Sequence, residues 1–419
     1  MTAPFRFVHT ADLHLDGPVH SSLERLRRQV DAARRTALQR LADVALQQRV
    51  DAFLVAGDLA DESCLTLRTE AFLTEQLARM ADAGITVVVA TGNADPGREG
   101  GRTSRVRWPD GVHVVDDSTP TTIDCKRDGQ VVGRVVAVGH RSENESGSLI
   151  ADMVAPEGGV PTVGLCHALI AGSVGKNRHA RVAPATPTDL AARPFAYWAL
   201  GHVHQRQQIG ESPAWYAGPP QASGFAETGS QGGLMVTCGD VTKAEFIPTA
   251  SMRFEVLSPE GLSGVSTESD LQACIELALE GPRTDPHEKD DTSWAVRVEL
   301  SGPCGLTEAL RRPARRAEMA DALTESLGVA HVELVDVGLT TLVDPAEHRD
   351  SGHLLGQGLD LLEEARHDDE LLAALMASTD GPLDSCDAKS DAARNARVRD
   401  LLGDLPGVIT ESLLKEDDR

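Results

Sequence analysis

The chain has 419 residues, 41% of them hydrophobic, and a formal net charge of −24 at pH 7. Its length allows a large core and more than one domain, while its charge excludes a protein that coats itself uniformly on DNA. A nucleic-acid enzyme of this composition needs local basic surface and bound cations to offset phosphate repulsion.

The compartment follows from what the chain lacks. No apolar run approaches the roughly 20 residues that cross a bilayer, and residues 1–6 lack the basic and apolar blocks of a signal peptide. The seven cysteines are scattered, odd in number and without a Cys-x-x-Cys pair, which predicts neither a disulfide framework nor a cysteine-based zinc site. We expect a cytoplasmic protein with no membrane partner.

Strands and helices alternate in the first 250 residues. Apolar runs typical of buried parallel strands occur at 5–8, 52–56, 86–90, 163–165 and 198–200. Helical spacing spans 21–48, with Ser21 or Ser22 as N-cap, and 65–83, ending near Gly84. After Asp110 short strands follow at 112–115, 131–138, 234–237 and 244–247. This order predicts a layered α/β domain over 1–250, with two sheets flanked by helices.

Potential metal ligands follow each of the five buried runs. They are Asp12, His14, Asp58, Asn93, His167, His202 and His204. Side chains at the carboxyl ends of parallel strands converge on one crevice, so these seven ligands are enough for two ions. Their mixed nitrogen and oxygen shell suits Mn, Fe or Zn better than Mg or Ca.

Each segment has a plainer interpretation when taken singly. Asp-x-His, Gly-Asp and Gly-Asn are ordinary turn sequences. The Gly201 to His204 loop is more specific, because two imidazoles on one tight loop are costly to keep unless they bind something. The ordered set of five segments favours a metal site.

With these five segments, the sequence resembles the calcineurin-like metallophosphoesterase superfamily, and within it the SbcD and YhaO-like DNA repair exonucleases. The similarity runs from Phe7 to about residue 250. The stretch from His9 to Asp16 resembles the YhaO-like first motif, and the stretch from Tyr216 to Pro220 resembles the strand and loop after the last metal motif. The resemblance implies a four-layer sandwich of two sheets flanked by helices.

The resemblance also implies how the ligands divide. One metal would be held by Asp12, His14, Asp58 and His204, and the other by Asp58, Asn93, His167 and His202. Asp58 would bridge them, and Asp58, Asn93 and His167 would form the catalytic core. Two ions, with Mn²⁺ favoured and Fe or Zn as alternatives, can clamp a phosphodiester and activate a water.

One position departs from the family. Its third motif reads Gly-Asn-His-Asp, whereas this chain has Ala94 between Asn93 and Asp95. The missing imidazole normally stabilises the transition state or protonates the leaving group, a contribution of roughly a hundredfold to ten-thousandfold. Three accounts remain open: another imidazole acts, from His20, His140 or His179; the metals suffice; or nuclease activity is lost. We favour weakened or altered activity.

Basic side chains that could contact DNA follow the third motif. They are Arg98, Arg102, Arg105 and Arg107, interleaved with glycines and followed by Trp108. The arginines could track a phosphate backbone while Trp108 stacks on a base; a solvated surface loop is the alternative. A second cluster, Arg311, Arg312, Arg315 and Arg316, either reaches the duplex or faces solvent.

Residues 251–345 change character and predict a small α+β domain. We expect strands at 253–257, 294–300 and 332–337, a helix at 268–279 with a Thr267 and Asp270 capping box, and helical pieces at 306–327 around Pro313. A surface loop is expected at 281–291. The resemblance places a capping domain that shapes DNA access here.

The tail, residues 346–419, is acidic with leucine-rich helical faces. The resemblance implies docking onto a coiled-coil SMC-like ATPase of the SbcC or YhaN type, and packing on the capping domain is the alternative.

The sequence as a whole therefore predicts a two-metal DNA phosphodiesterase, exonuclease or endonuclease, in double-strand break repair. The expected setting is cytoplasmic and nucleoid-associated, and a homodimer is left open. The alternatives are a catalytically weakened metal- and DNA-binding scaffold, or a small-substrate phosphatase or cyclic-nucleotide phosphodiesterase.

Overall fold

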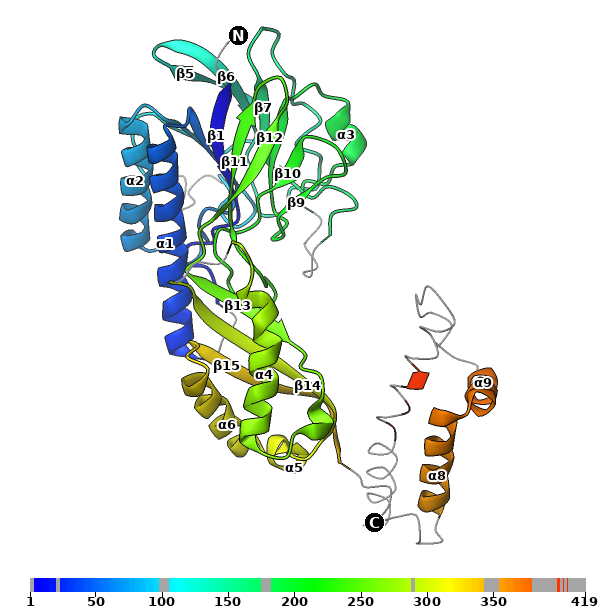
Figure 1. Ribbon diagram of the computed structural model, residues 1–419. Helices are drawn as coiled ribbons and strands as arrows, with labels where there is room; N and C mark the ends of the chain where they lie inside the picture. The colour runs from blue at the N-terminus through cyan, green and yellow to red at the C-terminus, as the bar shows by residue number, and fades with distance from the viewer. Residues whose placement is uncertain are drawn as a thin grey trace. The chain divides into compact units, whose positions relative to one another are not determined.

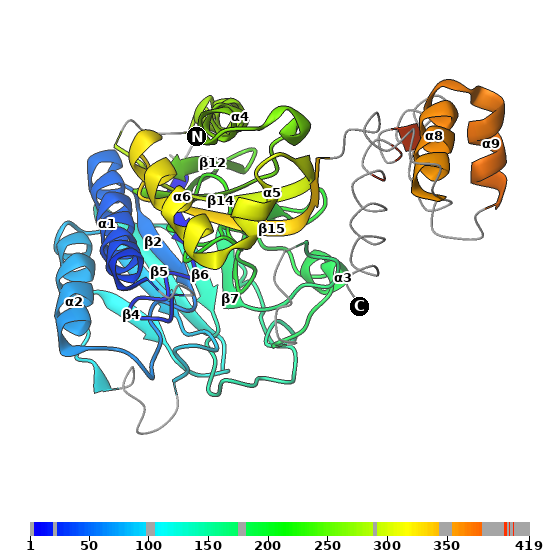
Figure 2. The same cartoon turned by 90° about the horizontal axis from the view of Figure 1, so that it is seen from below.

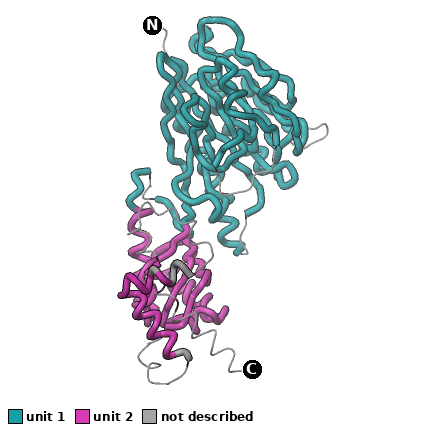
Figure 3. Tube along the Cα trace, turned by 90° about the vertical axis from the view of Figure 1, so that its right-hand side faces the viewer, with its two compact units in different colours: residues 1–255, 284–295 teal, residues 256–283, 296–419 magenta. Residues whose placement is uncertain are grey.

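The computed structural model describes residues 4–19, 23–97, 105–174, 182–287, 291–342 and 354–378, with isolated positions between 398 and 405. The chain forms two compact units (Figure 3). The first comprises residues 1–255 and 284–295, and the second comprises residues 256–283 and 296–419. Two of the three boundaries fall within strands and the third falls at the end of a helix, so the chain passes between the units three times.

The first sheet of unit one is mixed. Its order is β12-β11-β1-β2-β3-β4. Strands β1 to β4 run parallel, and β11 and β12 add an antiparallel hairpin beside β1. The bounds are Phe5–Thr10 for β1, Ala52–Ala56 for β2, Thr86–Ala90 for β3, Val112–Val115 for β4, Gly232–Cys238 for β11 and Lys243–Pro248 for β12. All five residues of β2 are buried, which explains its unbroken apolar run.

The second sheet has the order β5-β6-β7-β8-β10-β9. Strands β6, β7, β8 and β10 run parallel, while β5 pairs with β6 as a hairpin. The bounds are Thr121–Arg127 for β5, Gln130–Ala137 for β6, Thr162–His167 for β7, Tyr197–Gly201 for β8, Gln207–Gln208 for β9 and Ala214–Tyr216 for β10. Polar, exposed residues dominate β5, and this is why its sequence carried little signal.

The core lies between the two sheets. Side chains of β1 and β2, such as Phe7 and Leu54, share one buried cluster with Val135 of β6 and Leu165 of β7. Each such fully buried side chain contributes roughly 1.5–3 kcal/mol. Helices α1 (Glu24–Gln48) and α2 (Leu67–Asp82) cover the other face of the first sheet (Figures 1 and 2). Short helix α3 (Pro187–Ala191) packs outside the second sheet. The predicted α/β sandwich of two sheets flanked by helices is confirmed.

The start of α1 differs from the prediction. Leu23 occupies the N-cap position, and no side chain caps the helix there. Ser21 and Ser22, the expected caps, lie outside the described residues. Buried residues such as Leu38 and Leu41 stabilise α1 against the sheet, so the helix does not depend on a capping side chain.

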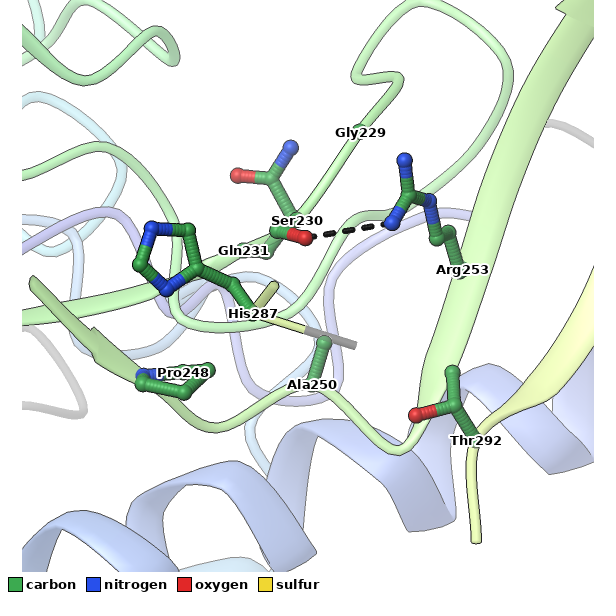
Figure 4. Close-up of a pocket in the computed structure, with 8 residues that line it drawn as sticks. All are labelled: Gly229, Ser230, Gln231, Pro248, Ala250, Arg253, His287 and Thr292. Carbon is green, nitrogen blue, oxygen red and sulfur yellow. Dashed lines mark hydrogen bonds between the residues drawn. The ribbon is translucent and has the colours of Figure 1, made fainter. Parts of the chain in front are cut away.

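The segment 284–295 returns to unit one through polar contacts. Arg253 donates from Nη1 to Ser230 Oγ at 3.2 Å and to Asp285 Oδ2 at 3.0 Å (Figure 4 shows the first bond). Ser230 Oγ also donates to Asp285 Oδ2 at 2.6 Å. The Arg253 guanidinium lies 4.8 Å from the ring centroid of Trp294. A largely buried arginine thus holds both ends of the returning segment.

Unit two is built around the sheet β13-β14-β15. Its elements are β13 (Met252–Leu257), α4 (Glu268–Arg283), β14 (Ser293–Cys304), α5 (Thr307–Arg311), α6 (Pro313–Ser326) and β15 (His331–Thr341). The capping box at α4 is present: Thr267 N donates to Asp270 Oδ2, and Asp270 N donates to Thr267 Oγ1. Pro313 occupies the first turn of α6, where a missing N–H is harmless.

One boundary in unit two was predicted wrongly. Helix α4 continues through Gly281 and Pro282 to Arg283, so the loop expected from residue 281 begins later. Leu271, Ile275 and Leu279 form its buried stripe. Their packing outweighs the single hydrogen bond that a proline removes in the last turn.

The described part of the tail contains α8 (Leu354–His367) and α9 (Asp369–Ser378). Ala365 and Leu372 form a small apolar cluster with Val398 and Leu402. These residues of the described part of the tail therefore pack on one another. Within the described residues, every helix is too short or too polar to span a lipid bilayer.

Candidate metal centre

The expected ligands stand at the carboxyl ends of parallel strands in both sheets. Asp12 and Asp58 each follow their strands, β1 and β2, by two residues, and His167 is the last residue of β7. Asp12, His14, Asp58 and His202 have positive φ angles of 56°, 46°, 53° and 102°. Non-glycine residues rarely adopt this conformation, and it clusters at functional sites. The tight turns aim the side chains back over the strand ends.

One half of the centre brings two imidazoles together with two carboxylates. His14 Nε2 lies 3.4 Å from Asp58 Oδ2 and 3.2 Å from His204 Nε2. His204 Nε2 lies 3.8 Å from Asp12 Oδ1. Asp12, His14 and His204 form a group whose ligand atoms can share one ion.

The other half assembles around His167. Its Nε2 atom lies 3.4 Å from Asp58 Oδ2 and 3.0 Å from Asn93 Oδ1. His202 Nδ1 lies 3.1 Å from the same Asn93 oxygen. Asp12, Asp58 and His167 form a second group able to hold an ion. The structure thus brings all seven expected ligands into one centre.

Hydrogen bonds assign the imidazole protons. His14 Nδ1 lies 2.7 Å from Asp61 Oδ1, and His204 Nδ1 lies 2.6 Å from Glu227 Oε1. A carboxylate only accepts, so each Nδ1 carries a proton and each neutral ring presents an Nε2 lone pair. His167 follows the same pattern, because its Nδ1 donates to the Ala56 carbonyl at 2.9 Å. Lone pairs of three rings therefore face carboxylate and amide oxygens or one another.

Such an arrangement of acceptors favours a positive charge between them, which a metal ion or a proton can supply. Two Nε2 lone pairs 3.2 Å apart repel each other unless a positive charge lies against both. Asp12 is 1% exposed, and its Oδ2 atom is buried without a hydrogen-bond partner. A buried carboxylate oxygen in that position is costly unless it coordinates a metal. These residues fit a divalent metal.

The charges of the centre perturb its pKa values. Burial raises the pKa of Asp12 to about 6 and lowers the pKa of His167 to about 3. Burial acts against ionised Asp58 as well, but the neighbouring His167 and His14 outweigh it and lower the pKa of Asp58 to about 2. For His14, burial favours the neutral ring, but Asp61 and Asp58 outweigh it and raise the pKa to about 9. The carboxylates thus favour a positive charge here, which a metal or a proton can supply.

The third motif positions the carboxylate of Asp58, whose Oδ2 atom lies 3.4 Å from an imidazole in each half. Asp95, 1% exposed, accepts N–H bonds from Asp58 at 3.1 Å, Leu59 at 2.8 Å and Gly92 at 2.7 Å. The Ala94 amide donates to Asp58 Oδ1 at 2.8 Å. The backbone of the third motif therefore holds Asp58 even though residue 94 carries only a methyl group.

Of the three suggested replacement imidazoles, the structure describes His140. His140 is fully buried, and its Nε2 donates to the His167 carbonyl at 2.6 Å. That proton is used inside the protein, where it braces the expected ligand His167. His20 and His179 lie outside the described residues.

The expected DNA contacts are only partly described. Arg105 and Arg107 are exposed, while Arg98 and Arg102 lie outside the described residues. Trp108 is half-buried and packs against the core beneath α2. Base stacking by Trp108 stays a prediction, and its ring already has a packing role.

The second arginine cluster makes contacts within its own unit. Arg315 pairs with Glu318 and Glu268, and Arg311 donates to the Leu339 carbonyl.

Two carboxylates of the site were missed by the sequence reasoning. Asp61 follows Asp58 by three residues, so proximity to a ligand was its signal. Glu227 lies 23 residues beyond His204, and nothing local marks it. Both orient imidazoles through Nδ1.

Residues 5–206 match the calcineurin-like phosphoesterase family. With the two-sheet fold and the centre at its strand ends, this match shows that the chain carries a calcineurin-like metallophosphoesterase domain. The expected resemblance is confirmed.

The chain also matches individual proteins whose names include a metallophosphoesterase and a nuclease subunit. The chain is 32% identical over 253 residues to the uncharacterized metallophosphoesterase YhaO of Bacillus subtilis, covering 58% of this chain and 60% of YhaO. It is 28% identical over 269 residues to the SbcD subunit of the SbcCD nuclease of Rhodobacter capsulatus, covering 55% and 65%. The chain thus matches less than two thirds of each relative. It is a homologue of YhaO and of SbcD nuclease subunits.

Among solved structures, the chain is matched to a dimetal phosphatase from Danio rerio, with a TM-score of 0.35 and 14% identity over 59% of this chain and 99% of that one. Another is the protein TT1561 of Thermus thermophilus, with a TM-score of 0.33 and 12% identity over 58% and 99%.

Proposed function

We propose that the protein is a two-metal phosphodiesterase. One metal is held by Asp12, His14, Asp58 and His204, and the other by Asp58, Asn93, His167 and His202. The observation that carries the proposal is the approach of His14 Nε2 and His204 Nε2 to 3.2 Å, with both Nδ1 protons directed to carboxylates. With both Nδ1 atoms protonated, the two Nε2 lone pairs can bind one metal ion, and the nearby carboxylates of Asp12 and Asp58 favour its charge.

Asp58 is suited to bridge the two ions. Its Oδ2 atom lies 3.4 Å from His14 Nε2 in one half and 3.4 Å from His167 Nε2 in the other. Its Oδ1 atom is held by the Ala94 amide. When bound, two ions supply Lewis acidity for the phosphodiester and lower the pKa of a water nucleophile.

The chain's own residues limit the reaction at the leaving group. The methyl group of Ala94 can neither donate a proton nor hydrogen-bond to a phosphate oxygen. His140, the described alternative, donates its proton to the His167 carbonyl. We therefore propose slow cleavage without a protein general acid: bound ions would supply charge stabilisation for the leaving oxygen, which would take its proton from solvent water.

We further propose DNA as the substrate, with a role in double-strand break repair and association with the nucleoid. Support comes from the SbcD relatives, whose names describe nuclease subunits. Mn²⁺ is the proposed metal. Residues 251–345 are proposed as a capping domain, and the tail from 346 as the docking segment for an SMC-like coiled-coil ATPase.

Ala94 also favours a second candidate, a scaffold that binds metals and DNA but does not cleave. The two candidates make the same prediction for metal binding and opposite predictions for cleavage. They can therefore be separated by one pair of assays.

The test combines Mn²⁺ titration with cleavage of end-labelled single- and double-stranded DNA. Wild type is compared with Asp58→Asn, Ala94→His and a control, Asp124→Asn, whose carboxylate only pairs with Arg134 in the described structure. Slow cleavage that is lost in Asp58→Asn, kept in the control and accelerated in Ala94→His supports the nuclease. Metal binding with cleavage only in Ala94→His supports the scaffold. Cleavage of a chromogenic phosphodiester without cleavage of DNA would refute DNA as the substrate, and absence of metal binding would refute both candidates.

A further inference from the structure

Arg34 is a buried charge that the proposed chemistry does not use. Its side chain is 2% exposed on α1, and its nearest carboxylate, Asp31, lies 3.7 Å away and is 39% exposed. Burial lowers the pKa of Arg34, and the charges of Asp31, Glu227 and Asp61 oppose that effect. A guanidinium in such a place is costly unless its hydrogen bonds are needed. Its two bonds lead to different loops of the centre.

The first bond reaches the loop of His14. Arg34 Nη1 donates to the Gly17 carbonyl at 2.8 Å, and Gly17 N donates to the His14 carbonyl at 2.9 Å. Gly17 also packs against Asp61, since a Cβ added at Gly17 would lie 2.2 Å from Asp61 Oδ2. Asp61 in turn orients His14 through Nδ1 at 2.7 Å. Arg34 therefore holds the turn that fixes both His14 and its carboxylate.

The second bond reaches the brace of His204. Arg34 Nη2 donates to Ser223 Oγ at 2.7 Å. Ser223 N donates to Glu227 Oε2 at 2.6 Å, and the other oxygen of Glu227 accepts the His204 Nδ1 proton at 2.6 Å. The loops carrying His14 and His204 are 190 residues apart in sequence, and Arg34 contacts the supports of both.

We propose that Arg34 is a positioning residue that holds His14 and His204 at the separation one metal ion requires. This inference rests on the proposed two-metal function and adds that the two ions are bound with separately tunable affinities. The other half is braced by different groups, because His167 donates to the Ala56 carbonyl and accepts a bond at its own carbonyl from His140. Loss of Arg34 weakens binding of the metal that His14 and His204 hold and leaves the affinity for the other metal nearly unchanged. The two-pronged geometry requires arginine, since a lysine ammonium cannot span both acceptors with a fixed fork.

The experiment is an Mn²⁺ titration of the full chain. Binding is measured by calorimetry and by the electron paramagnetic resonance signal of free Mn²⁺. Arg34→Met is compared with wild type and with Arg40→Met. Arg40 is a control on the same helix, because its guanidinium likewise bonds to groups far along the chain, the carbonyls of Thr249 and Ala250 and the carboxylate of Asp291. Asp61→Asn marks which binding event belongs to His14.

Removing a group that orients a metal ligand typically lowers metal affinity roughly 10- to 100-fold. In Arg34→Met we expect that loss of affinity for the Mn²⁺ binding event that Asp61→Asn also weakens. The affinity of the other binding event should change less than about threefold. Arg40→Met should bind both ions as wild type does. Unchanged affinities in Arg34→Met, or equal weakening of both events, overturns the inference. If wild type binds no Mn²⁺, the proposed metal function fails instead.

A smaller substitution covers the case in which Arg34→Met does not fold. Ser223→Ala removes the hydroxyl that accepts from Arg34 and keeps the backbone N–H that holds Glu227. We expect the same event to weaken several-fold. Wild-type affinity for both ions in Ser223→Ala and Arg34→Lys together would refute the role of Arg34.

Discussion

Substitution of Gly92 by alanine should displace the proposed bridging carboxylate. A Cβ at Gly92 would lie 2.2 Å from Asp58 Oδ1, 2.8 Å from Asp58 N and 3.0 Å from Asp58 Cγ. Because the second of these atoms is backbone and Asp95 holds it by a hydrogen bond, rotation of the Asp58 side chain cannot relieve the whole overlap. The loop or the carboxylate must move by about 1 Å, and a displacement of that size at a reacting centre can lower the rate about a hundredfold.

The assay measures Mn²⁺ affinity, phosphodiesterase activity and urea unfolding for wild type, Gly92→Ala and Gly147→Ala. Gly147 is a suitable control because an added Cβ meets nothing within 4 Å. Overpacking at Gly92 should reduce the free energy of unfolding by about 1–3 kcal/mol, together with at least a tenfold loss of metal affinity. Gly147→Ala should match wild type in all three measurements. If Gly92→Ala binds Mn²⁺ and turns over substrate as wild type does, the assigned position of Asp58 is wrong.

Three further outcomes are expected. Asp95→Asn places an amide N–H against the Leu59 N–H donor and should lower the free energy of unfolding by about 1–3 kcal/mol in urea titrations. A change below the error of the measurement would contradict the role of the Asp95 carboxylate in holding this loop. Trp108→Ala should destabilise the protein because its ring packs on the core, and in DNA-binding assays a folded variant with unchanged affinity would exclude base stacking. Asp285→Asn should destabilise the protein at pH 7. Burial acts to raise the pKa of Asp285, but its bonds from Ser230 and Arg253 outweigh it and lower the pKa. That stabilisation is present above the unfolded-state pKa of about 4 and disappears as pH falls through the lower folded value. If Asp285→Asn loses as much unfolding free energy at acid pH as at neutral pH, the lowered pKa of Asp285 is contradicted.

The ligands were predictable from the sequence because their signals are local. A buried parallel strand such as β2 is an unbroken apolar run, and Asp58 follows it after one glycine. Parallel strands end at the same edge of a sheet, so five such patterns imply one crevice. The replacement in the third motif at Ala94 could also be read from the chain alone.

Other features depended on contacts that no local pattern records. The extension of α4 through Pro282 followed from packing of a buried stripe, and the packing of Trp108 on the core was not visible in its arginine-rich neighbourhood. Strand β5 was missed because its exposed residues are polar, although its pairing with β6 places it in the sheet.

The sequence by itself determined the α/β class and the strand ends, and it predicted the candidate ligands, since periodicity and turn chemistry act over a few residues. Only the tertiary structure decided which groups orient those ligands. Glu227 meets His204, and Arg34 meets both Gly17 and Ser223, because folding brings loops together across large sequence separations. The Nδ1 proton positions of His14 and His204 follow from such long-range hydrogen bonds, which leave the two Nε2 atoms facing each other.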